Sequence, residues 1–129
     1  MTLMVLVVDD EPDIEVLFRQ QFRRDLRAGR FVMDFVGSAA QALAHVVDVG
    51  EQTLILILSD INMPGMSGLD MLPQMRARRP DVPIIMISAY GDNQTRKTAL
   101  ERGADDLFTK PVDLGRLRGE IEMRIGSVA

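Results

Sequence analysis

Three short apolar runs rich in β-branched residues most constrain how this chain can fold. They are residues 3–8, 54–59 and 83–87. None alternates polar with apolar residues, as a strand with one wet face would, so we expect strands that are covered on both faces of a parallel sheet. Two weaker runs, 31–36 and 105–110, contain acidic residues, which suits the edge strands of such a sheet.

Between these runs, apolar residues recur with the spacing of amphipathic helices. These stripes span residues 14–26, 39–47, 68–75 and 114–125. The last three follow a serine or aspartate in the N-cap position, namely Ser38, Ser67 and Asp113. Residues 92–102 also look helical but offer only two apolar residues to bury, so we expect that helix to be held loosely.

Strands and helices therefore alternate along the chain, which predicts an α/β protein with right-handed crossovers and helices on both faces of the sheet. With the second and fifth strands at the edges, we expect a doubly wound (βα)5, flavodoxin-like three-layer sandwich with a five-stranded parallel sheet in the order 2-1-3-4-5. The 129 residues fit one domain of ordinary size. We found no repeat or linker-like stretch, so we expect a single domain over residues 1–129.

Composition excludes several classes of function. There is no cysteine, which rules out a disulfide scaffold, thiolate metal sites and a cysteine nucleophile. The net charge of −4 gives no general case for nucleic-acid binding. The N-terminal "MTLMVLVVDDEPD" is apolar over too few residues, and lacks the basic flank, for a signal peptide or membrane span. We expect a cytoplasmic protein that contacts neither membrane nor nucleic acid.

Polar side chains stand where the predicted strands end. Asp9 and Asp10 follow the first strand, Asp60 the third and Ser88 the fourth, while Lys110 ends the fifth. Ligands of such sheets bind beyond these carboxyl ends. Carboxylates gathered there repel one another, and Mg²⁺ with its preference for oxygen ligands relieves that repulsion. With a lysine and a hydroxyl for phosphoryl oxygens, an aspartate here can act as the nucleophile of phosphoryl transfer.

The chain resembles the receiver domain of two-component response regulators, of the chemotaxis-regulator-like kind, over essentially its whole length. The resemblance makes Asp60 the phosphoacceptor, which takes its phosphoryl group from the phosphohistidine of a sensor histidine kinase or phosphotransfer protein. Ser88 resembles the switch hydroxyl of the family, and Lys110 its phosphate-pairing lysine. The segments that carry the resemblance are "VLVVDDEPD", "LILSDINMPGMSGLDML", "PIIMISAY" and "GADDLFTKPVD".

The resemblance also implies a metal site and an output. Asp9 and Asp10 resemble the acidic pair that holds Mg²⁺ together with Asp60, and Asn62 would give its backbone carbonyl to the metal. Phosphorylation would change the face made by the fourth helix, the fifth strand and the fifth helix, and so signal to a downstream effector domain or protein. Such a phosphoprotein catalyses its own phosphorylation and slow dephosphorylation but does not turn over small molecules. Whether it forms a homodimer, and whether an effector domain has been removed, is left open.

One position departs from the family pattern. The family usually has an aromatic residue three positions before the lysine, where this chain has Leu107 followed by Phe108. Because side chains alternate along a strand, Phe108 should point to the opposite face of the sheet. Tyr90 could cover the site instead. We also expect a cis bond before Pro111.

The same residues allow other interpretations. The alternative to a phosphorylated switch is a pseudo-receiver that serves only as an interaction module. An aspartyl phosphohydrolase would usually need a second acid at position 62, where this chain has Asn62, and a flavin site lacks its Ser/Thr-rich loop after the first strand. The only histidine, His45, is interpreted as a surface or boundary residue. The arginines of 19–30 and 76–79 are interpreted as solvated faces, with a docking surface for an acidic partner as the lesser alternative.

Overall fold

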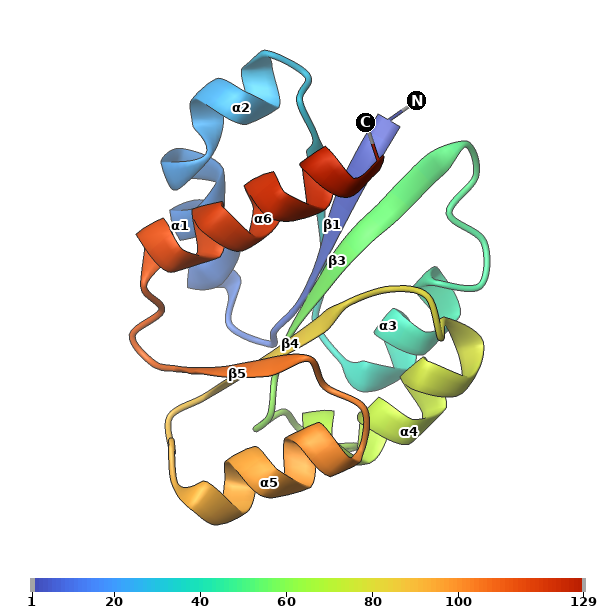
Figure 1. The fold of residues 1–129 in the computed structure, drawn as a ribbon, viewed down its shortest axis with the longest axis vertical. Coiled ribbons are helices and arrows are strands. Elements are labelled where there is room, and N and C mark those ends of the chain that lie inside the picture. Colours follow the sequence, from blue (N-terminus) through green and yellow to red (C-terminus); the bar gives the residue numbers. More distant parts are fainter. Residues whose placement is uncertain (1, 129) are drawn as a thin grey trace.

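The computed structural model describes residues 2–128, which form one five-stranded parallel sheet flanked by six helices (Figure 1). The strand order is β2-β1-β3-β4-β5, so the predicted fold class is confirmed. Every neighbouring pair of strands is parallel. The strands are β1 (Thr2–Val8), β2 (Val32–Val36), β3 (Gln52–Asp60), β4 (Ile84–Ser88) and β5 (Asp106–Thr109).

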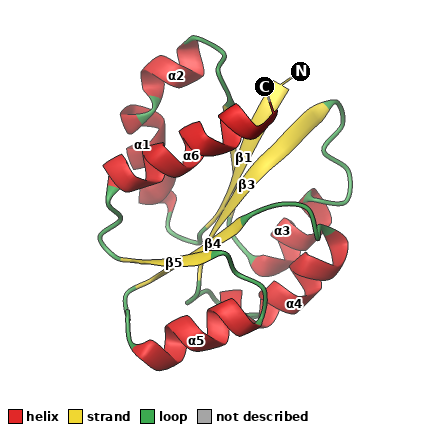
Figure 2. Cartoon of the chain, viewed as in Figure 1, coloured by secondary structure: helices red, strands yellow, loops and turns green. Residues whose placement is uncertain are grey.

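The helices cover both faces of the sheet (Figure 2). α1, α2 and α6 lie over one face, and α3, α4 and α5 over the other. Among residues 2–128, we found no helix with both the length and the apolar character needed to cross a membrane. The helices are α1 (Pro12–Gln21), α2 (Arg23–Arg27), α3 (Ala39–His45), α4 (Gly68–Arg78), α5 (Asn93–Glu101) and α6 (Leu114–Val128).

The central strands are buried on both faces, as their unbroken apolar sequence predicts. In β1, Leu6 and Val8 belong to the core beneath α3, α4 and α5, whereas Val5 and Val7 belong to the core beneath α1, α2 and α6. Each of these four side chains is at most 1% exposed. The sheet therefore has one packed core on each face, and the two cores together hold the carboxyl ends of the strands in fixed positions.

The segment that was expected to form one helix over 14–26 is instead two helices that meet at Phe22. The backbone there leaves helical geometry, with φ of −106° and ψ of 16°. The ring of Phe22 is 1% exposed and packs edge-on against Phe18 and Phe31, with ring centroids 6.3 Å and 6.0 Å away. These aromatic contacts turn the chain, so that α2 runs in a different direction from α1 (Figure 1).

The expected helix starts are confirmed in three cases. The side-chain oxygens of Ser38, Ser67 and Asp113 each accept a hydrogen bond of 3.1 Å from the backbone N–H three residues later. Each satisfies a donor that the first turn of a helix would leave unpaired. Helix α5 buries only Ala99, in agreement with its apolar-poor sequence.

Arg76 of α4 joins three parts of the fold through its guanidinium. It donates to the backbone oxygens of Val82 and Gly103, the latter at 2.6 Å from Nη2 and 3.0 Å from Nε, and to the carboxylate of Asp105 at 2.9 Å. Losing these donors leaves partly buried carbonyl groups without partners. We therefore predict that Arg76→Met lowers the free energy of unfolding by about 2–4 kcal/mol, measured by urea denaturation.

The control for this prediction is Arg78→Met on the same helix. Arg78 is exposed and, among residues 2–128, makes a single hydrogen bond, to the Gln74 carbonyl at 3.3 Å. Its replacement should change stability by less than about 0.5 kcal/mol. Equal effects of the two substitutions would show that the Arg76 contacts contribute nothing beyond those of a surface arginine.

Candidate functional site

The ends of β1 and β3 bring together the three predicted carboxylates. One oxygen from each of Asp9, Asp10 and Asp60 lies within 4.8 Å of the others. The three differ in burial, because Asp60 is 3% exposed, Asp9 is half-buried and Asp10 is exposed. The cluster therefore has a buried floor at Asp60 and an open side at Asp10.

Asp60 is the last residue of β3, and both of its carboxylate oxygens are held. Oδ2 accepts a hydrogen bond from Nζ of Lys110 at 3.1 Å, and Oδ1 accepts one from the backbone N–H of Asn62 at 3.3 Å. The carboxylate is thus fixed in rotation and faces the rim of the sheet.

One carboxylate oxygen of Asp9 is held by the backbone of the turn that follows β1. Its Oδ1 accepts a hydrogen bond from the backbone N–H of Glu11 at 2.9 Å. Burial raises the pKa of the Asp9 carboxyl above its ordinary value, and the charge of Asp60 adds to this, although the Glu11 bond and Lys110 act in the opposite direction. A negative charge on Asp9 is therefore costly in the folded protein.

Sequence analysis missed the backbone donors of Glu11 and Asn62. Each lies two residues after the acid that it contacts, which is the geometry of a turn closed by an aspartate side chain. An aspartate at the end of a strand, followed by a turn, is therefore the sequence signal that could have predicted these two backbone donors.

Lys110 is the positive charge of the site. Burial lowers the pKa of its ammonium, but the hydrogen bond to Asp60 and the negative charges of Asp60, Asp9 and Glu11 outweigh burial and raise that pKa above its usual value. The ammonium is therefore charged at neutral pH. The peptide bond between Lys110 and Pro111 is cis, as expected.

Ser88 ends β4, and Lys110 directly follows β5, the strand next to it. It is 1% exposed, and its Oγ accepts a hydrogen bond from the backbone N–H of Tyr90 at 3.0 Å. The backbone N–H of Lys110 donates to the Ser88 carbonyl at 2.8 Å, which couples the two strand ends directly. Among residues 2–128 the hydroxyl makes no hydrogen bond to the side chain of Asp60 or Lys110.

The loop after Asp60 depends on two glycines. Gly65 has φ of +79°, a left-handed conformation that favours glycine. Gly68 donates its N–H to the Ile61 carbonyl at 2.8 Å, and a Cβ on Gly68 would lie 2.2 Å from the backbone oxygen of Asp60. The start of α4 is thus pressed against the strand end that carries Asp60.

The residues that replace the usual aromatic switch lie on opposite faces of β5, as alternation predicted. Leu107 belongs to the core beneath α3, α4 and α5, and Phe108 to the core beneath α1, α2 and α6. The guanidinium of Arg116 lies over the Phe108 ring, 4.2 Å from its centroid. Phe108 is therefore fixed away from Ser88. Tyr90 is 67% exposed, so most of its side chain faces solvent.

His45 pairs with an acid of the neighbouring edge strand. Its Nε2 lies 2.9 Å from Oδ2 of Asp34, and both side chains are 35% exposed. This agrees with its interpretation as a boundary residue.

Solved structures with the same fold include a CheY-like receiver domain from Methanospirillum hungatei and a response regulator receiver protein from Pseudomonas putida. The first has a TM-score of 0.83 and 24% identity over 98% of this chain and 96% of that one. The second has a TM-score of 0.79 and 26% identity over 95% of this chain and 98% of that one.

Proteins with a similar sequence are also response regulators and transcriptional regulatory proteins. PilR of Pseudomonas aeruginosa is 42% identical over 116 residues, which are 88% of this chain and 24% of PilR. PrrA of Mycobacterium leprae is 33% identical over 118 residues, which are 92% of this chain and 48% of PrrA. This chain thus spans only a quarter to a half of these relatives. The family model of the response regulator receiver domain matches residues 5–122, and the chain belongs to that family.

Proposed function

We propose that this chain is a phosphorylation-dependent switch of a two-component phosphorelay, with Asp60 as the phosphoacceptor. The donor is the phosphohistidine of a sensor histidine kinase or phosphotransfer protein. One observation carries the proposal: the buried carboxylate of Asp60 is bonded to Lys110 at 3.1 Å and lies within 4.8 Å of the Asp9 and Asp10 carboxylates. The proposed nucleophile, Asp60, therefore has the Lys110 ammonium on one side and two further carboxylates close to it.

In the proposed reaction, a carboxylate oxygen of Asp60 attacks the phosphorus of the phosphohistidine. The new P–O bond forms as the P–N bond breaks, and the electron pair of that bond stays with the imidazole. The Lys110 ammonium, now bonded to Asp60, would pair with the phosphoryl oxygens as they arrive. Such pairing stabilises the charge of the transferred group.

We propose that Mg²⁺ binds to Asp9, Asp10, Asp60 and the backbone carbonyl of Asn62. These ligands are oxygen atoms, which Mg²⁺ prefers, and the three carboxylates are within reach of a single ion. The raised pKa of Asp9 reflects a need for positive charge at this point. Bound there, Mg²⁺ would neutralise charge on the phosphoryl oxygens in the transition state.

The proposed output is a change in the face made by α5, β5 and α6, through which an effector domain or protein, or a second copy, would sense phosphorylation. Movement of Ser88 and Lys110 toward a phosphoryl group would act on both strand ends at once, because the Lys110 N–H is bonded to the Ser88 carbonyl. α5 directly follows β4 and buries only Ala99, so moving it disturbs few core contacts.

The test of this function is phosphorylation of the protein by acetyl phosphate. With Mg²⁺ present, intact-mass spectrometry should show the gain of one phosphoryl group, and hydroxylamine should release it because an acyl phosphate is reactive. Chelation of the metal should prevent the gain. A protein that keeps its mass under these conditions would instead be a pseudo-receiver that acts by interaction alone.

We predict that Asp9→Asn stabilises the metal-free protein at neutral pH by about 1 kcal/mol, since it removes a costly charge. The folded pKa of Asp9 lies above its ordinary value. The folded protein therefore has its full stability while the Asp9 carboxyl is protonated, at a pH below the pKa of about 3.9 in the unfolded chain. It loses stability as the pH rises through the folded pKa and the carboxyl ionises. Urea denaturation at neutral pH should show the gain, which should vanish below about pH 4.

Two further measurements sharpen this prediction. Mg²⁺ should raise the melting temperature of the unmodified protein more than that of Asp9→Asn, because the variant lacks one ligand. Asp13→Asn, which alters an exposed acid outside the carboxylate cluster, should not stabilise the protein. An Asp9→Asn variant that is less stable than the unmodified protein at neutral pH would contradict the electrostatic account.

A further inference from the structure

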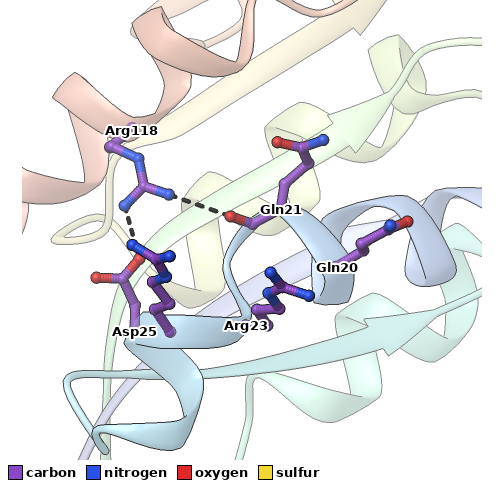
Figure 3. A pocket seen from close by; sticks show the side chains of 6 residues that line it. Gln20, Gln21, Arg23, Asp25 and Arg118 are labelled. Carbon is purple, nitrogen blue, oxygen red and sulfur yellow. Dashed lines mark hydrogen bonds and ion pairs between the residues drawn. The ribbon is translucent and has the colours of Figure 1, made fainter.

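A polar cavity of about 540 Å³ opens where α1 meets α2, opposite α6 (Figure 3). It lies beside the turn at Phe22 that separates α1 from α2, where Asp25 of α2 meets the side chain of Arg118 on α6 (Figure 3). It lies at the end of α1 away from the carboxylate cluster, which precedes the start of that helix. The residues that line it are Gln20, Gln21, Arg23, Arg24, Asp25 and Arg118.

The one acid of this cavity is already neutralised from within the protein. Oδ2 of Asp25 accepts a hydrogen bond from Arg118 at 2.6 Å, and Oδ1 accepts one from Arg30 at 2.6 Å. The Arg118 bond, with help from Arg30, holds the pKa of the Asp25 carboxyl below its usual range despite burial. Arg118 also donates to the Gln21 carbonyl at 3.2 Å, which fixes its guanidinium across the cavity.

The remaining polar groups of the cavity are free. Arg23 and Arg24 are exposed, and among residues 2–128 their guanidinium groups form no ion pair or hydrogen bond. Within the same residues, the side-chain amides of Gln20 and Gln21 form no hydrogen bond either. The lining thus holds three positive charges against one paired negative charge, on a chain whose net charge is −4.

We propose that this cavity binds an acidic peptide segment of a partner protein. A guanidinium binds a carboxylate through two parallel hydrogen bonds, as Arg118 and Arg30 already bind Asp25 in part. The glutamine amides each offer a donor and an acceptor, which matches the N–H and C=O of a peptide backbone. The volume of the cavity falls within the range of ligand pockets and suits several residues of an extended chain.

The observations favour a peptide over a nucleic acid. The lining consists of glutamine, arginine and aspartate, so it lacks an aromatic surface on which bases could stack. Arg23 and Arg24 belong to a chain whose net charge is −4, so a long polyanion would extend beyond them over an acidic protein and meet repulsion. A short acidic segment can stay within the positive region.

The test measures binding of a fluorescein-labelled peptide rich in aspartate and glutamate by fluorescence anisotropy, using the full chain. We expect saturable binding that weakens as salt is added, because the contacts are ionic. The same peptide with each acid replaced by its amide should bind at least about tenfold more weakly, as should the double variant Arg23→Gln with Arg24→Gln, equivalent to about 1.4 kcal/mol.

The matched control is Arg78→Gln, an exposed arginine without an ion pair among residues 2–128, which should leave the affinity unchanged. Arg23 and Arg24 are exposed, and within residues 2–128 their side chains form no hydrogen bond or ion pair, so the double variant should fold normally. Its phosphorylation by acetyl phosphate should also be unaltered, which separates this proposal from the function of Asp60. The proposal is overturned if the acidic peptide does not bind, if the double variant binds it equally well, or if an oligonucleotide of the same charge binds more tightly.

Discussion

Asp60→Asn is expected to abolish the gain of a phosphoryl group from acetyl phosphate. The amide has nearly the shape of the carboxylate, and its single oxygen can still accept a hydrogen bond from one of the two donors of Asp60, the Lys110 ammonium or the Asn62 backbone N–H. It carries no negative charge, however, and cannot form a stable acyl phosphate. The loss should therefore reflect missing chemistry and not a missing fold. Intact-mass spectrometry of protein treated with acetyl phosphate and Mg²⁺ measures it directly.

The control for Asp60→Asn is Asp13→Asn, which changes an exposed acid close to the carboxylate cluster in the sequence. This variant should gain one phosphoryl group at the rate of the unmodified protein. Circular dichroism of both variants should match that of the unmodified protein. If Asp60→Asn still gained a phosphoryl group, another side chain would be the acceptor, and Asp9 and Asp10 would be the first to examine.

Much of the fold could be predicted because its signals are local. The apolar runs that became β1, β3 and β4 lack polar alternation, and this reports burial on both faces of the sheet. The strand order then followed from which runs were interrupted by acids. Convergence of Asp9, Asp10, Asp60 and Lys110 needed only the rule that carboxyl ends of parallel strands share an edge.

The features that could not be predicted depend on contacts distant in sequence. The apolar stripe over 14–26 reads as one helix, and the turn at Phe22 arises from packing against Phe31, nine residues later. The cavity between α2 and α6 lies beside that turn, where Arg118 meets Asp25, a residue 93 positions before it in the chain. From the sequence, the arginines of residues 19–30 were interpreted mainly as a solvated face, with a docking surface for an acidic partner as the lesser alternative, and nothing in the sequence placed Arg118 beside them.

Gly68→Ala is expected to lower the free energy of unfolding by about 3 kcal/mol or more. The added Cβ would lie 2.2 Å from the Asp60 backbone oxygen and 3.0 Å from Cα of Ile61. The end of the Met86 side chain, at 2.8 Å, can move, but the backbone of β3 cannot move without disturbing its pairing with β1 and β4. Urea denaturation measures the loss of stability.

The same substitution tests whether the start of α4 positions the phosphoacceptor. Relief of the clash requires Asp60 or the loop after it to shift, so the protein that remains folded should be phosphorylated more slowly by acetyl phosphate. Gly119→Ala is the matched control, because a Cβ at that position of α6 meets nothing within 4 Å. It should stabilise the helix by about 0.5–1 kcal/mol. If Gly68→Ala were as stable as the unmodified protein and as readily phosphorylated, the packing of α4 against the end of β3 would not be what holds Asp60 in place.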